Sequence, residues 1–285
     1  KKLPGICVMC GQPTEQITRE HIWPDWFLKN MDALGPPSAP WAANGELLRD
    51  RDGQPIHPRA RTRVLIPACE PCNNAMGKQF ELPAKDVVRR LAANKWAGSA
   101  SRKEWQAIGY WFAKVLLLLG HPQARYANPR NDPFTVRFDA QAPPPDCAWL
   151  SKAARPPVDL SVWIHNTALQ ETEPNHVMRV PRAAVSPDGT LAHCHELTLA
   201  TPGACVTLLS HPGGTVDHPL VAQGHAWELL RSPPADGSDL SAMPSLSDRD
   251  VFWFRSRERP TGYTITDESN DPEWRLKELF GTDEI

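Results

Sequence analysis

Two pairs of closely spaced cysteines constrain this chain more than any other feature of its sequence. Cys7 and Cys10 form the first C-x-x-C pair, and Cys69 and Cys72 form the second. A gap of two residues lets both sulfur atoms of one turn reach the same ion at about 2.3 Å, which suits tetrahedral Zn²⁺. Because four thiolates would complete that coordination sphere, the sequence predicts a structural zinc site rather than a catalytic one.

Three polar residues stand next to these cysteines and are not needed by the zinc. Glu20 and His21 lie between the two pairs, and Asn73 directly follows Cys72. An imidazole can take a proton from water, and carboxylate and amide oxygens are ligands that hard divalent cations accept. The set therefore fits metal-assisted hydrolysis of phosphodiester bonds, with a divalent cation neutralising the leaving oxygen.

The combination of these residues resembles a known nuclease family, the HNH endonucleases, whose zinc-bound fold is called ββα-metal. The likeness is strongest to phage endonuclease VII and to McrA-like restriction nucleases, and it covers residues 5–82. Two features depart from the usual pattern: the acid is Glu20 where Asp is commoner, and residues 11–68 separate the two cysteine pairs. The motifs that carry the likeness are Cys7-x-x-Cys10, Glu20-His21-Ile22-x-Pro24 and Cys69-x-x-Cys72-Asn73, with Gly77-Lys78 behind them.

The resemblance implies a role for each of these residues. His21 would be the general base, and Glu20 and Asn73 would be the ligands of a catalytic Mg²⁺ or Mn²⁺. The structural Zn²⁺ would be held by Cys7, Cys10, Cys69 and Cys72. The resemblance also implies hydrolysis of DNA that leaves 5′-phosphate and 3′-hydroxyl ends. Restriction, anti-phage defence and mobile-element biology are all compatible with such an activity.

Two other interpretations of the same residues stay open. One is a zinc-stabilised module that binds nucleic acid or protein without cutting it, which the formal net charge of −2 favours. The other is a nuclease that acts on RNA or branched DNA. Under the main interpretation the expected partner is double-stranded DNA, and a homodimer or a regulatory protein partner would add to it.

The distribution of charge predicts where a nucleic acid would bind. Residues 1–100 hold 14 Lys and Arg against 10 Asp and Glu, whereas the remainder holds 17 against 23. Phosphate contacts are therefore expected in the N-terminal third. The candidates are Lys78, on the helix after Cys72, and Arg59, Arg61 and Arg63, which alternate and so point the same way on an extended segment. A solvated strand end explains the three arginines equally well.

The order of the predicted elements indicates an α+β fold in three parts. Residues 1–82 would form the nuclease domain, with an inserted loop at 32–63, a strand at 17–23 and a helix from 72 to 80. A helical connector at 83–125 would pack on it, with Pro83 breaking the helix and with Ser101 and Glu104 forming a capping box. Residues 130–285 would form a β-rich domain with a targeting role. Its predicted strands are 134–138, 160–164, 176–180, 197–200, 205–209 and 251–254, followed by a terminal helix at 272–280.

The cysteine count and the hydropathy pattern bear on the compartment. Seven cysteines is an odd number, and Cys147, Cys194 and Cys205 have no partner at a useful spacing. This usage is typical of a reducing compartment with bound zinc rather than of a secreted disulfide scaffold. No apolar run approaches the roughly 20 residues that a membrane span needs. The expected location is therefore the cytoplasm.

Overall fold

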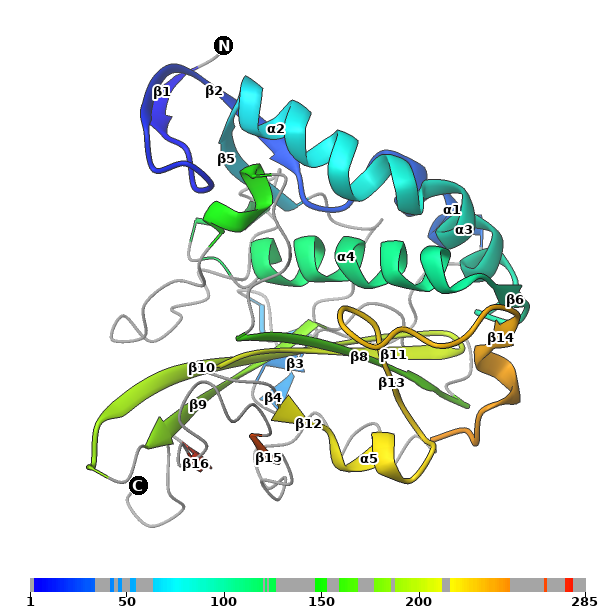
Figure 1. Cartoon of the computed structure of the whole chain (residues 1–285). Helices are drawn as coiled ribbons and strands as arrows, with labels where there is room; N and C mark the ends of the chain where they lie inside the picture. Colours follow the sequence, from blue (N-terminus) through cyan, green and yellow to red (C-terminus); the bar gives the residue numbers. More distant parts are fainter. Residues whose placement is uncertain are drawn as a thin grey trace.

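The structure is a computed structural model, and it combines helices and antiparallel sheets in an α+β fold, as the sequence predicts. Figure 1 shows a layer of helices above a large sheet, with the long helix α4 as the member of that layer next to the sheet. The small N-terminal sheet stands at one end of the helical layer. The parts of the chain that the structure describes are residues 3–33, 42–43, 46–47, 52–54, 64–119, 121, 123–126, 147–152, 159–168, 177–185, 188–211, 216–246, 264–265 and 275–278.

The small sheet carries the segment between the two cysteine pairs. Its strands lie in the order β1 (Leu3–Ile6), β2 (Pro13–His21), β5 (Val64–Cys69) and β7 (Arg125–Tyr126), and all the pairs are antiparallel. The predicted strand at 17–23 is therefore present, but it begins earlier and ends at His21. In its register Glu20 lies opposite Ile66, and His21 lies opposite Leu65.

One long helical rod follows β5 without a break. It consists of α2 (Glu70–Met76), a π-helical turn (Gly77–Glu81) and α3 (Leu82–Ala93). The prediction that Pro83 interrupts the helix was wrong. Leu82 N–H bonds to the carbonyl of Gly77, five residues back, and this wider turn lies directly before Pro83. Pro83 then stands in the first turn of α3, where a missing N–H costs little.

Helices α1 (Asp25–Ala33) and α4 (Arg102–Leu119) complete the helical layer. The capping box at the start of α4 is confirmed: Ser101 N–H donates to the Glu104 carboxylate at 2.7 Å, and Glu104 N–H donates to Ser101 Oγ at 3.3 Å. From Trp105 onward most side chains of α4 are buried on every side of the helix. This follows from its position, because α4 contacts α3 on one side and the large sheet on the other.

The large sheet has six antiparallel strands in the order β13-β8-β11-β10-β9-β16. Four of the six predicted strands are confirmed within it, and the predicted strands at 134–138 and 251–254 lie outside the described residues. The predicted terminal helix at 272–280 was wrong, because residues within it form β16, an edge strand paired with β9. The strands are β8 (Leu160–Asn166), β9 (Val177–Val185), β10 (Leu191–Thr201), β11 (Ala204–Ser210), β13 (Trp227–Glu228) and β16 (Arg275–Glu278).

One cluster of buried apolar residues runs from the first cysteine pair through α4 to the upper face of the large sheet. Its members include Cys7, Trp111 and Leu208, so the helical layer and the sheet share this core. The division into three parts stays a prediction. The remaining short elements are β3 (Ala42–Ala43), β4 (Glu46–Leu47), β6 (Ser99–Ala100), β12 (Val216–Asp217), β14 (Ser238–Asp239), β15 (Thr264–Ile265), α5 (Pro219–Ala222), and 3-10 turns at Ala148–Ser151 and Leu240–Ala242.

Among the helices that the structure describes, none is both long enough and apolar enough to pass through a membrane.

Candidate metal centre and the polar cluster beside it

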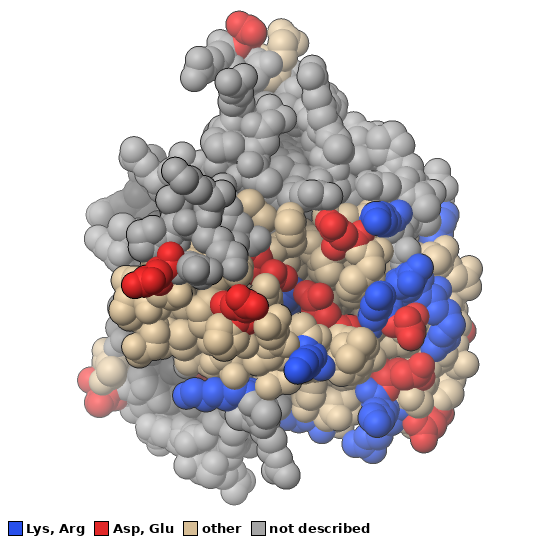
Figure 2. Space-filling view, turned by 90° about the horizontal axis from the view of Figure 1, so that it is seen from above, with Lys and Arg blue, Asp and Glu red and all other residues tan. Residues whose placement is uncertain are grey.

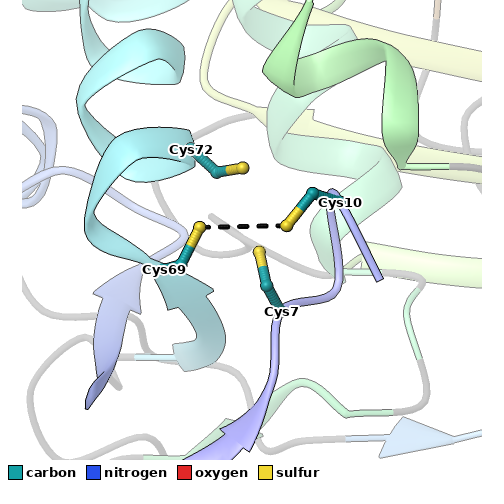
Figure 3. Close-up of side chains that lie close together, drawn as sticks. All are labelled: Cys7, Cys10, Cys69 and Cys72. Carbon is teal, nitrogen blue, oxygen red and sulfur yellow. Dashed lines mark hydrogen bonds between the residues drawn. The ribbon is translucent and has the colours of Figure 1, made fainter. Parts of the chain in front are cut away.

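The four cysteines of the two C-x-x-C pairs come together at one point, as predicted. Figure 3 shows their side chains converging from the turn after β1 and from the start of α2. All four sulfur atoms lie within 4.8 Å of one another, and Cys10 Sγ is 3.9 Å from Cys69 Sγ. Four sulfurs around one zinc at about 2.3 Å would stand about 3.8 Å apart, so the arrangement fits a tetrahedral ion. None of the seven cysteines forms a disulfide.

Local backbone structure explains why each pair presents its sulfurs together. The first pair sits in a tight turn, in which Gly11 N–H donates to the carbonyl of Cys7 at 2.9 Å. The turn is tied to the second pair's strand by the N–H of Val8, which donates to the carbonyl of Pro67 at 3.1 Å. In the second pair, Cys69 is the extended N-cap residue of α2, and Cys72 follows in its first turn.

The electrostatic environment differs among the four thiols. Burial alone would raise the pKa of Cys7, but hydrogen bonds from the backbone of Cys69, Cys10 and Met9 outweigh it and lower that pKa to about 7. Burial raises the pKa of Cys72, and the neighbouring cysteines raise it further. Cys7 and Cys72 thus differ in proton affinity, and a bound cation would favour the ionised form of both. The cluster could therefore hold a metal ion such as zinc.

Glu20, His21 and Asn73 also come together beside this cluster. Glu20 and His21 end β2, and Asn73 lies in the first turn of α2, next to Cys72. The Asn73 side chain lies near enough to the Glu20 carboxyl to lower its pKa, and His21 is near enough to lower it as well. All three residues are partly exposed, so water and a substrate can reach them.

Burial dominates the titration of Glu20. It raises the pKa of the carboxyl above its usual value, and repulsion from Glu81 adds to the rise. Attraction from Lys114 and the proximity of Asn73 and His21 lower this pKa without cancelling the rise. Burial thus disfavours the charge on Glu20, and a divalent cation bound there would stabilise that charge.

The donor set at this second position fits a hard cation held by few protein ligands. Apart from the four cysteines, no group of three or more His, Cys, Asp and Glu within the described chain has its ligand atoms close together. Glu20 and Asn73 would therefore offer two oxygens, with water and a phosphate completing the coordination. This is the way in which Mg²⁺ is ordinarily bound at phosphoryl-transfer sites.

The sequence did not reveal the buried ion pair that borders this site. Lys114, on α4, is fully buried, and its ammonium lies 2.7 Å from the Glu81 carboxylate. It also donates to the carbonyl of Ile22 at 2.8 Å. The available signal was a lysine in the middle of the apolar stripe of α4.

A cluster of packed aromatic side chains lies next to the segment that follows His21. Trp23 and Phe27 stack with their ring centroids 5.2 Å apart, and Phe27 packs on Trp111 of α4 at 4.9 Å. Trp23, Phe27 and Trp111 are all buried. The segment that follows His21 is thus pressed against α4, which explains why Lys114 can reach the backbone there.

The predicted phosphate contacts are only partly placed. Lys78 is exposed on the π-helical turn, five residues after Asn73, whereas Arg59, Arg61 and Arg63 lie outside the described residues.

Figure 2 looks down on the helical layer and shows Lys and Arg interleaved with Asp and Glu towards the α3 end. A shallow depression of about 320 Å³ there is lined by Asp86, Arg89, Arg90 and Ala93. Along the rod its lining residues lie about 20 to 30 Å from Asn73, so it does not belong to the polar cluster.

No protein family, curated protein or solved structure matches this chain. The likeness to the HNH endonucleases therefore rests on the motif residues of the sequence alone and stays a prediction.

Proposed function

We propose that this chain is a metal-dependent endonuclease of the HNH type that hydrolyses phosphodiester bonds in double-stranded DNA. One observation carries the proposal: Glu20 and His21 at the end of β2 and Asn73 in the first turn of α2, far apart in the sequence, come near one another next to the four-cysteine cluster. Two antiparallel strands, β2 and β5, followed directly by α2, supply the scaffold. A non-catalytic module has no need for this combination of base, oxygen ligands and exposure.

Each residue has a distinct task in the proposed reaction. His21 accepts a proton from the attacking water, which is the role that an imidazole performs best near neutral pH. Glu20 and Asn73 would hold the divalent cation, Mg²⁺ or Mn²⁺, which when bound stabilises the charge that develops on the phosphate and the leaving oxygen.

The four cysteines have a structural task. A zinc ion held by Cys7, Cys10, Cys69 and Cys72 has no open coordination position, so it would not activate water itself. It would instead fix the turn after β1 to the start of α2, and through these the distance between Glu20 and Asn73. Lys78 would contact a phosphate of the bound DNA.

The β-rich part of the chain is proposed to direct the nuclease to its target. A site made of three small groups has little capacity to read a DNA sequence, because specificity requires contacts with base edges or with DNA shape. Recognition would then come from the large sheet, from a regulatory protein partner or from a homodimer that cuts both strands. A reducing compartment such as the cytoplasm, and a role in restriction or anti-phage defence, fit this arrangement.

A cleavage assay tests the proposal. Purified protein is incubated with supercoiled plasmid, single-stranded DNA, branched DNA and RNA, each in the presence of Mg²⁺, Mn²⁺ or EDTA. The same panel is run with His21→Ala and with His225→Ala, a matched control on a half-exposed histidine of the β-rich part. Metal-dependent cutting of the plasmid that only His21→Ala abolishes supports the proposal. Cutting of RNA or branched DNA alone would assign a different substrate to the enzyme, and binding without cutting would favour a non-catalytic module.

A further inference from the structure

Lys114 is a buried cation outside the segment that resembles a nuclease. It lies on α4, in a chain segment well beyond residue 82, and its side chain is fully buried. A buried ammonium is unfavourable unless it is paired and hydrogen-bonded, so its partners account for its presence there. Both of its recorded hydrogen-bond partners lie in the candidate nuclease segment.

The first partner is the backbone directly behind the proposed general base. Lys114 Nζ donates to the carbonyl of Ile22 at 2.8 Å, and Ile22 follows His21 in the chain. His21 is the last residue of β2, so the sheet no longer fixes the backbone after it. The bond from Lys114 therefore holds the peptide at the point where the strand's own hydrogen bonds end.

The second partner is a carboxylate near the proposed cation ligand. Its ammonium lies 2.7 Å from Glu81 Oε1, and both Lys114 and Glu81 interact electrostatically with Glu20. The formal charge of Glu20, Glu81 and Lys114 together is −1. Lys114 neutralises one of the two carboxylates, and the remaining negative charge attracts a divalent cation.

We propose that Lys114 is a positioning residue of the nuclease site: from α4 its hydrogen bond to the Ile22 carbonyl fixes the backbone directly after Glu20 and His21, so that the N-terminal segment depends on α4 for its activity. This inference rests on the proposed function. The competing explanation is that Lys114 and Glu81 form only a structural ion pair, whose removal affects stability and nothing else.

Variants of the pair separate the two explanations. Lys114→Met leaves Glu81 unpaired and is expected to be unstable, so the main test is Lys114→Met/Glu81→Gln, which removes both charges and keeps the formal charge of the group at −1. Lys114→Arg keeps a charged donor for both partners. Lys103→Met, on the exposed first turn of α4, is the matched control.

Four quantities are measured for each protein: the unfolding temperature, the zinc content, the affinity for Mn²⁺ from its paramagnetic resonance signal, and the rate of plasmid nicking. A positioning role predicts that the double variant folds with full zinc, binds Mn²⁺ more weakly and nicks on the order of 10-fold to 100-fold more slowly, because a shift of about 1 Å in reacting groups costs that much. Lys114→Arg should retain more of the rate, and Lys103→Met should retain all of it.

The outcomes that overturn the inference differ from those that overturn the function. Wild-type Mn²⁺ affinity and nicking in the double variant would leave Lys114 with a structural role only. Equal loss in the double variant and in Lys114→Arg, with both folded and holding zinc, would also contradict positioning through the donated hydrogen bonds. A wild-type protein that neither binds Mn²⁺ nor nicks any nucleic acid would remove the proposed function, and this inference with it.

Discussion

Glu20 is the residue at which function and stability make opposite demands. Burial and repulsion from Glu81 raise the pKa of its carboxyl, so its ionised form is less stable in the folded protein than in the unfolded chain. At neutral pH the folded state therefore carries a penalty for this charge. A residue that keeps such a penalty is explained by a task that needs the charge, and cation binding is that task in the proposed mechanism.

Replacement of Glu20 by Gln should separate the two demands. Glu20→Gln retains the size and a hydrogen-bond acceptor for Asn73 but removes the charge, so we expect the unfolding temperature to stay the same or to rise. Metal-dependent nicking should fall by about 100-fold or more, because the cation loses its only carboxylate in the proposed ligand pair. Thermal unfolding and plasmid nicking measure the two effects. A variant that is destabilised yet fully active would contradict this assignment.

Residues of the candidate site were predictable from the sequence where their chemistry is local. The two-residue spacing in each cysteine pair and the position of Asn73 directly after Cys72 already specify a turn and a helix start. The partnership of Lys114 with Ile22 and Glu81 was not predictable, because it joins three segments whose distances depend on tertiary packing. The arginines Arg59, Arg61 and Arg63 stay a prediction.

Helices and strands were likewise predictable where their signals are local in the sequence. The capping box of α4 and four strands of the large sheet have local signals and are confirmed. The continuous rod through Pro83 depends on a π-helical turn, which has no clear sequence signal. The sequence around the last strand, β16, favours a helix, but the segment forms a strand because β9 supplies hydrogen-bond partners along the sheet edge. Pairing with a distant strand thus overrides local preference.

The loop between β10 and β11 joins the large sheet to the helical layer. Gly203 there has a φ of +84°, and a Cβ on it would lie 1.8 Å from the carbonyl oxygen of Lys95, which follows the end of α3. Beside this contact the indole N–H of Trp96 donates to Thr201 Oγ1 at 3.0 Å. The close approach of two backbones leaves no room for a side chain at Gly203.

A pair of glycine substitutions tests this junction. Gly189, in the turn between β9 and β10, also has a φ of +84°, but a Cβ there would meet nothing within 4 Å. Both Gly→Ala variants carry the strain of a positive φ, about 1 kcal/mol, so their difference isolates the close approach. We expect Gly203→Ala to lower the free energy of unfolding by at least about 2 kcal/mol more than Gly189→Ala in denaturant titrations. Equal losses would show that the junction is loosely packed.

At the scale of the whole molecule, stability should depend on the metal and on pH. Structural zinc contributes on the order of 10 kcal/mol to folding in small zinc peptides, and the four-cysteine cluster ties β1 to α2. Removal of the metal with a chelator, or Cys72→Ser, should lower the unfolding temperature markedly and release zinc. Cys205→Ala, a buried cysteine outside the cluster, should keep the zinc and cost far less. Calorimetry with a zinc assay measures both, and unchanged unfolding after complete metal loss would contradict a structural role.

His218 should make the protein less stable in mild acid. Burial lowers the pKa of His218 well below its usual value, and the charge of nearby His165 lowers it further. The folded ring stays neutral while the unfolded chain takes up a proton below about pH 6.5, so the unfolded state binds more protons and stability falls as the pH drops. The expected slope is about 1.4 kcal/mol per pH unit in that window.

A cap-preserving variant isolates this contribution. His218 Nδ1 accepts the N–H of Leu220 at the start of α5, and Asn can accept the same bond. His218→Asn should therefore show a flatter fall in the free energy of unfolding between pH 6.5 and pH 5 than the wild type. Parallel curves for the two proteins would mean that His218 does not resist protonation in the folded state.

The decisive measurement for the proposed nuclease is the nicking rate of supercoiled plasmid under single-turnover conditions, for the wild type and His21→Ala at equal zinc content. A general base contributes about 100-fold to 10,000-fold, so we predict a Mn²⁺-dependent wild-type rate and a variant slower by that factor with an unchanged unfolding temperature. Equal rates in the two proteins, or a wild type that cuts as fast in EDTA, would contradict the assignment of His21 and of the metal-dependent site around it.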